Sequence, residues 1–200
     1  FACGSFAFEK GRKPCFYPGT FDPFSLGHKA VACKIRDLGF DIYLALDEFS
    51  WSKHTQPRLM RRKIMNMSVA DEENMYPFPD DIPINIANPA DIKKLKEIFA
   101  GRDLYIAVGT DVIENASAYR AVPTPDSIHT VNHIAFARET RENPETDQPE
   151  KTYGIQGKVI RLTLDKFYED ISSTKIRENI DLNRDISNLI DAVAQNFIYD

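Results

Sequence analysis

Apolar and polar positions follow two different periods along this chain, and together they predict a sheet covered by helices. Short continuous apolar runs fit buried strands, whereas apolar residues three or four positions apart fit amphipathic helices. Strands alternating with helices are typical of an α/β fold with a mostly parallel sheet and flanking helices. The predicted strands are 14–17, 41–49, 82–87, 104–108, 133–138 and 158–164, and the predicted helices are 29–38, 56–70, 88–100 and 185–198.

Two segments show neither period and are predicted as loops. Residues 71–81 are acidic and contain proline, and residues 139–151 are polar with two prolines, which is typical of a surface loop or an insertion. The sequence starts on Phe1 without an initiating Met. We therefore expect residues 1–13 to be an N-terminal extension, the end of an upstream segment, and residues 14–200 to form one domain.

Composition and charge narrow the class of protein. The 200 residues are 42% hydrophobic, which suffices for one globular core. A net charge of −5 argues against a general nucleic-acid binder, and no apolar run reaches membrane-spanning length. Three cysteines without metal-ligand spacing, and no secretory signal, favour reduced thiols in the cytoplasm. Positive charge is concentrated at 53–63 and 175–177, as an acidic protein that handles phosphates requires.

The first candidate site lies where the first predicted strand ends. Residues 18–28 read PGTFDPFSLGH, a glycine-containing turn that leads directly into a predicted helix. A helix N-terminus presents backbone N–H groups and a positive dipole, and phosphate is the usual occupant of such a turn. Gly19 allows a ligand to approach the backbone, and Ser25 and His28 can face one cleft because they are three residues apart. Each residue alone fits a structural role, but the whole string indicates a phosphate site.

The second candidate site lies near the end of the sequence. Residues 170–177 read DISSTKIR, so three consecutive hydroxyl residues follow the last predicted strand and precede a helical segment. The hydroxyls can donate hydrogen bonds to phosphate, and Arg177 can bind phosphate through two parallel N–H groups. In isolation this string fits an ordinary helix cap with solvated charges better than a binding site.

Together the two strings resemble the nucleotidyltransferase superfamily. Its members carry a (His/Thr)-x-Gly-His turn near the start and an Ile-Ser-Ser-Thr-x-x-Arg-type motif near the end. The resemblance spans residues 14–198 and implies a Rossmann-like, doubly wound fold. Within the superfamily the chain is most similar to nicotinate mononucleotide adenylyltransferases, on GTD at 109–111 and on 171–177. The YPGTFDP string at 17–23 and the hydroxyl at Ser25 are instead similar to phosphopantetheine adenylyltransferases.

The resemblance implies transfer of an adenylyl group from ATP to a mononucleotide acceptor, nicotinate mononucleotide, with release of pyrophosphate. His28 would contact the α- and β-phosphates and stabilise the transition state together with Arg177. Ser25 would stand in for the first motif residue, as a hydroxyl that donates to phosphate. Mg²⁺ would arrive with ATP, without a dedicated protein site. The residues implied to bind ATP are Gly19, Thr20, Phe21, His28, Ser172, Ser173, Thr174 and Arg177.

The acceptor side depends on looser matches. The resemblance places an acceptor-binding loop after the second strand, where Trp51 and Lys53 stand, and it places Asp111 near the ribose or the acceptor. The stretch around Trp51 fits a solvated loop equally well. We expect ATP and a phosphate-bearing small molecule as partners, no nucleic acid or membrane, and a neighbouring domain if the chain is longer. Three alternatives stay open: another acceptor such as a phosphopantetheine, CTP in place of ATP, and a non-catalytic nucleotide-sensing domain.

Overall fold

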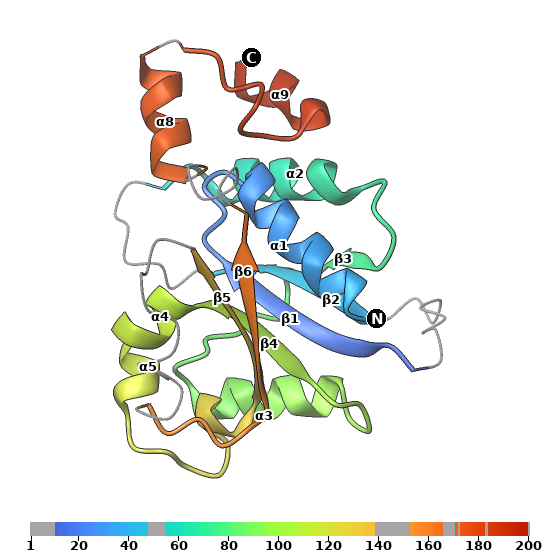
Figure 1. Cartoon of the computed structure of the whole chain (residues 1–200), viewed down its shortest axis with the longest axis vertical. Helices are drawn as coiled ribbons and strands as arrows, with labels where there is room; N and C mark the ends of the chain where they lie inside the picture. Colours follow the sequence, from blue (N-terminus) through green and yellow to red (C-terminus); the bar gives the residue numbers. More distant parts are fainter. Residues whose placement is uncertain are drawn as a thin grey trace.

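A computed structural model describes residues 11–47, 55–138, 153–165, 171, 173–182 and 184–199 of this chain, with only the backbone at 138 and 196–199. Six parallel strands form one sheet in the order β3-β2-β1-β4-β5-β6 (Figure 1). The strands are β1 Lys13–Gly19, β2 Phe40–Leu46, β3 Met75–Pro77, β4 Tyr105–Gly109, β5 Asn132–Arg138 and β6 Val159–Leu164. This confirms the doubly wound, Rossmann-like fold.

Helices cover both faces of the sheet. The helices are α1 Leu26–Asp37, α2 Arg58–Val69, α3 Pro89–Ile98, α4 Thr110–Asn115, α5 Ser117–Arg120, the 3₁₀ helix η1 Ile128–Thr130, α8 Ser173–Asp181 and α9 Ala192–Tyr199. One hydrophobic core joins α1, α2 and α9 to the sheet, and a second joins α3, α4, α5 and η1 to its other face. Figure 1 shows the resulting three layers, with α8 and α9 (orange and red) stacked beyond α1 and α2.

The central strand shows why the apolar runs predicted strands. In β1, Cys15 and Tyr17 belong to the core under α1, and Phe16 belongs to the core on the opposite face. A strand buried on both faces needs apolar side chains at consecutive positions, so it reads as a run without alternation. The order of strands reverses between β1 and β4, and ligands of doubly wound folds bind at the carboxyl ends of the strands beside that point.

The edge of the sheet was predicted wrongly. The third strand is β3 at Met75–Pro77, inside the predicted loop 71–81, and residues 82–87 form turns and irregular structure. The strand is short and pairs with β2 on one side only, so it lacks the apolar run of a central strand. Within 82–87, Ile84 is buried by packing on the α3 side of the sheet. Its apolar character therefore reflects burial without strand pairing.

The C-terminal helix was also predicted too long. Helix α9 begins at Ala192, and residues 184–191 form turns. The Asp185 carboxylate accepts the backbone N–H of Ser187 and so forms a local turn. The Asp191 carboxylate accepts the backbone N–H of Val193 at the start of α9. Ile186 and Ile190 are nevertheless buried, in a small core with Ile171 and Ile176. The helical spacing of these isoleucines was real, but the turns place them in the core.

Candidate functional site

The turn after β1 lies at the carboxyl edge of the sheet and is tightly folded. A Cβ on Gly19 would lie 2.5 Å from the ring of Phe21, so only glycine fits beside that ring. Phe21 itself has a φ of 46°, in the left-handed region that a bulky residue rarely adopts. Such a residue is held by its surroundings, and strained backbone of this kind is concentrated at functional sites. The buried ring of Phe21 packs edge-on against Tyr17, with the ring centroids 5.3 Å apart.

Helix α1 begins at the end of this turn with an unusual cap. The Ser25 hydroxyl accepts the backbone N–H of His28 at 3.3 Å, and the backbone N–H of Ser25 donates to Nδ1 of His28 at 3.0 Å. This is a capping box in which histidine replaces the usual glutamate. The Ser25 Oγ also lies 3.0 Å from the same Nδ1, and Ser25 is only 2% exposed. The structure thus brings Ser25 and His28 together at the start of the helix.

Aromatic rings hold the imidazole of His28 from two sides. Its ring stacks on Phe24, with centroids 5.5 Å apart and planes inclined by 29°. Phe21 meets it edge-on at 5.0 Å. Contacts of this kind restrict both side-chain torsions of the histidine. The orientation of His28 is therefore built into the protein before any ligand binds.

The C-terminal motif meets this turn directly. The Ser173 hydroxyl donates to the Pro23 carbonyl at 3.1 Å. The Arg177 guanidinium donates to the Asp22 carbonyl at 2.6 Å and lies 3.6 Å from the Asp22 carboxylate. It also donates to the Thr174 hydroxyl at 3.3 Å. Two strings about 150 residues apart thus lie against each other, and we refer to them below as the two walls of the candidate site.

Gly27 explains how the two walls come so close. A Cβ at this position would lie 3.2 Å from the carbonyl oxygen of Ile171, which precedes α8. The first N–H of α1, that of Leu26, donates to the Leu189 carbonyl at 2.9 Å. On the same helix, Lys29 pairs with Asp191 at 2.8 Å. The segment that follows α8 is therefore fixed to the first turns of α1.

A buried arginine on α2, Arg61, supports the turn after β1. The sequence motifs did not reveal this role. Arg61 is 6% exposed, and its guanidinium donates to the Thr20 carbonyl at 2.7 Å and to the Gln56 carbonyl at 3.0 Å. Among the described residues, no carboxylate lies within 4.0 Å of it. Burial lowers the pKa of Arg61, and the charge of Asp22 acts in the opposite direction. The sequence showed Arg61 only as one of four basic residues around a helix.

Residues on β1 and β4 complete the floor of the site. A Cβ on Gly109 would require the exposed Asp111 carboxylate to turn away, and it would lie 3.4 Å from the ring of Phe136. Asp111 is exposed at the start of α4. The buried Tyr17 hydroxyl has no hydrogen-bond partner in the described part of the chain. Burial, followed by the charges of Cys15 and Asp111, raises the pKa of Tyr17.

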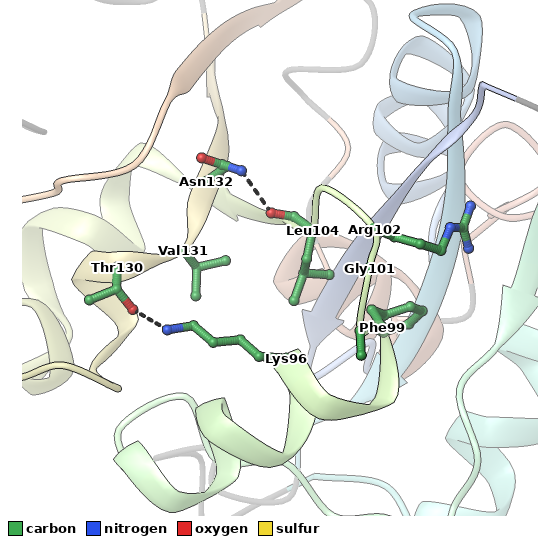
Figure 2. Close-up of a pocket in the computed structure, with 9 residues that line it drawn as sticks. Lys96, Phe99, Gly101, Arg102, Leu104, Thr130, Val131 and Asn132 are labelled. Atoms are coloured by element: carbon green, nitrogen blue, oxygen red, sulfur yellow. Dashed lines mark hydrogen bonds between the residues drawn. The ribbon is translucent and has the colours of Figure 1, made fainter.

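One pocket among the described residues lies at the other end of the sheet. It has a volume of about 200 Å³ and is lined by residues at the end of α3 and at the start of β4 and β5. Figure 2 shows Lys96 donating to the Thr130 hydroxyl, at 2.6 Å, and Asn132 donating to the Leu104 carbonyl, at 3.1 Å. These polar groups are satisfied within the protein, and the nearby helix end carries a negative dipole. This pocket lies at the amino ends of β4 and β5, away from the turn after β1.

A second, narrower pocket lies at the carboxyl ends of β1 and β2. It is lined mainly by apolar residues, among them Pro18, Leu46 and Phe78, together with the ion-paired Arg58 and Asp80. It therefore adjoins the phosphate turn on the β2 side. Three of the predicted site residues, Trp51, Lys53 and Ser172, lie outside the described residues.

No helix among the described residues has the length and apolar character needed to cross a lipid bilayer. In that same part of the chain, no group of three or more His, Cys, Asp or Glu side chains could hold a metal ion.

Known proteins share this fold. The structure superposes on Plasmodium falciparum nicotinic acid mononucleotide adenylyltransferase complexed with NaAD, with a TM-score of 0.73 and 17% identity, over 94% of this chain and 95% of that one. For the same enzyme complexed with APC the values are 0.70 and 18%, over 94% of both chains. A search of curated proteins gives no match. The family model described as cytidylyltransferase-like matches residues 16–179, and the chain therefore belongs to the cytidylyltransferase-like family.

Proposed function

We propose that this chain transfers an adenylyl group from ATP to nicotinate mononucleotide. A phosphate oxygen of the acceptor attacks the α-phosphorus of ATP, the bond from that phosphorus to the bridging oxygen breaks, and pyrophosphate leaves. No enzyme nucleophile is needed. The protein has to align the two phosphates and stabilise the charge that develops between them.

The junction of the two phosphate motifs is the observation that carries this proposal. His28 and the first turn of α1 form one side, and Ser173, Thr174 and Arg177 on α8 form the other. A triphosphate spans several ångströms and carries charge along its length, so it needs donors on both sides. In this arrangement His28 would act at the α- and β-phosphates, and the α8 residues would hold the β- and γ-phosphates.

The acceptor would lie on the β2 side of the turn. The pocket beside Pro18 has a volume of only about 10 Å³, so it would have to open to admit the ring of the acceptor. Asp111, at the start of α4, is available to a ribose hydroxyl. Trp51 and Lys53 follow β2 in the sequence and stay part of this proposal. The NaAD in the Plasmodium falciparum complex is named for that enzyme and motivates the choice of nicotinate mononucleotide here.

Mg²⁺ would enter the site bound to ATP. This ion prefers phosphate oxygens and water, with one or two carboxylates at most. Asp111, an exposed carboxylate at the start of α4, is the residue that we propose to contact such a complex.

Pyrophosphate release with a panel of acceptors tests the function. The purified chain, ATP and Mg²⁺ should release pyrophosphate with nicotinate mononucleotide and form the dinucleotide. The His28→Gln variant should lower kcat by at least about 100-fold. The Lys34→Gln variant, changed on the far side of α1 where Lys34 binds the Thr163 carbonyl, should be unaffected.

Other results would point to the alternatives. The family description favours CTP as the second nucleotide, so each acceptor is also tested with CTP. Turnover with phosphopantetheine would identify a different acceptor. ATP binding without turnover on any acceptor would contradict the proposal and support a nucleotide-sensing domain.

A further inference from the structure

We infer that Ser25 is a positioning residue that fixes the proton of His28 on Nε2, and that its hydroxyl does not bind phosphate. The inference rests on the proposed function for its effect on catalysis. The hydrogen-bond geometry that carries it does not depend on that function.

The backbone of Ser25 determines the tautomer. Its N–H lies 3.0 Å from Nδ1 of His28 and can only donate, so Nδ1 must accept and carry no proton. In a neutral imidazole the proton then lies on Nε2. The same geometry disfavours the doubly protonated ring, because a protonated Nδ1 would face the Ser25 N–H.

The side chain of Ser25 is committed to the same bond. A hydroxyl has one proton, and the unprotonated Nδ1 at 3.0 Å is the acceptor that faces it. The oxygen accepts the His28 N–H at 3.3 Å. Phosphate oxygens offer only acceptors, so the Ser25 hydroxyl could bind them only by giving up its bond to His28. Ser25 is also 2% exposed, which leaves little surface for a ligand.

The ring contacts complete the positioning. Phe24 stacks on the imidazole and Phe21 meets its edge, so a 180° flip of the ring in this slot would place Cδ2 where Nδ1 lies and Cε1 where Nε2 lies. The capping box opposes that rotation, because only Nδ1 meets both donors of Ser25. Catalysis gains a donor of known position, since an N–H aimed before binding needs no reorganisation in the transition state.

Nitrogen-15 NMR of the histidine side chains tests the tautomer directly. His28→Gln identifies the His28 signals. In the unmodified chain we expect an unprotonated Nδ1 and a protonated Nε2, both before and after saturation with a non-hydrolysable ATP analogue. A protonated Nδ1, or a tautomer that changes when the analogue binds, would overturn the inference even if no Ser25 variant folds.

Two substitutions separate positioning from phosphate binding. Ser25→Ala removes the hydroxyl, which is one of the two donors that face Nδ1, and keeps the backbone N–H. We expect a minor population of the Nδ1-protonated tautomer to appear in the ring-nitrogen signals, a kcat lowered about 10-fold or more, and a KM for ATP within about twofold of the original value. Ser25→Thr keeps the hydroxyl and should restore both the tautomer signature and kcat. Unchanged His28 signals with a KM for ATP raised about 10-fold in Ser25→Ala would show a direct phosphate contact.

The failure of the proposed function would look different. In that case the unmodified chain would release no pyrophosphate with any acceptor. The tautomer of His28 could still be measured in the same protein. The NMR spectrum alone would then show whether the proton is on Nε2.

Discussion

Two buried aspartates at opposite ends of the sheet are both 2% exposed, but they are held in different ways. Asp41, at the start of β2, accepts hydrogen bonds from Arg12 at 3.0 Å, Asn74 at 3.1 Å and Arg102 at 3.3 Å. Two guanidinium groups and an amide thus surround one carboxylate. This end of the sheet satisfies its charges internally, which is what a structural network requires.

Asp22, in the turn after β1, has looser partners. Its carboxylate accepts the Gln56 N–H at 3.2 Å and lies 3.6 Å from Arg177, which is 36% exposed. Nearby, the buried Arg61 binds carbonyl oxygens and has no carboxylate within 4.0 Å among the described residues. Among the described residues, Arg177 and Arg61 at this end have Asp22 as their only carboxylate within 4.0 Å, and it contacts Arg177 alone. The comparison indicates that the amino end of the sheet stabilises the fold and that the carboxyl end is arranged for an anionic ligand.

The largest expected effect comes from breaking the amino-end network. Asp41→Asn leaves two partly buried guanidinium groups without their counter-charge, and we expect the free energy of unfolding to fall by about 3–5 kcal/mol. Urea unfolding measures this change. At a temperature where the variant is folded, its pyrophosphate release should equal that of the original chain.

A matched control is available at the same end of the sheet. Asp103 is 41% exposed and pairs with Lys13 at 3.4 Å and Lys158 at 3.6 Å. Asp103→Asn should change the free energy of unfolding by less than about 1 kcal/mol. Equal losses in the two variants would show that burial of Asp41 is not what matters.

The next effect is a pH dependence of stability at His133 on β5. Its ring is fully buried, and Tyr119 lies 3.0 Å from Nε2. Burial lowers the pKa of His133 from 6.5 to about 4, against a smaller opposing effect of the Val131 carbonyl. Between these values the unfolded chain binds a proton that the folded chain does not. Stability should therefore be full above pH 6.5 and fall by about 3 kcal/mol as the pH drops to 4.

Urea unfolding at a series of pH values measures this slope. In the His133→Asn variant the free energy of unfolding should depend less steeply on pH over the same range. The unfolded variant takes up about one proton fewer relative to its folded state. A slope that is unchanged in this variant would assign the acid sensitivity to other groups.

At the carboxyl end we expect activity to change more than stability. Asp22→Asn keeps an oxygen that can accept the Gln56 N–H, but it removes the charge beside Arg177. The free energy of unfolding should fall by about 1 kcal/mol or less, whereas kcat/KM should fall about 10- to 100-fold, which equals about 1.4–2.7 kcal/mol. Steady-state kinetics and urea unfolding provide the two measurements.

Asp165→Asn serves as the control for this loss of one negative charge. Asp165 is exposed and lies 3.6 Å from Lys34. Neither kinetics nor stability should change measurably. If Asp22→Asn lowered stability as much as Asp41→Asn did, the two ends of the sheet would not differ in the way described.

The central strands could be predicted from the sequence, because their signals are local. The two candidate phosphate motifs are local strings as well, and their binding of phosphate stays a prediction. Strands buried on both faces give continuous apolar runs, as in β1 and β4. The edge strand β3 could not be predicted in this way, since a three-residue strand paired on one side needs little apolar character. The turns at 184–191 keep helical spacing without a helix.

Within the site, residue type indicated the chemistry but not the contacts. Ser25 and His28 were expected to face one cleft, yet the sequence gives no sign that they bond to each other. The burial of Arg61 could not be predicted either, because a buried arginine and a solvated one give the same sequence pattern on a helix. Such contacts depend on segments far apart in the chain, and only the folded structure brings those segments together.

The smallest effect tests how close the two walls of the site must be. Gly27→Ala adds a Cβ 3.2 Å from the Ile171 carbonyl, so α8 must move by a few tenths of an ångström. Alanine also favours the helix over glycine by up to about 1 kcal/mol, which offsets the crowding in the folded state. We therefore expect stability within about 0.5 kcal/mol of the original and a KM for ATP raised about three- to fivefold, equal to about 0.7–1 kcal/mol. A more stable protein with an unchanged KM would show that α8 can withdraw without loss, and that the close approach of its backbone to α1 is not needed to hold the nucleotide.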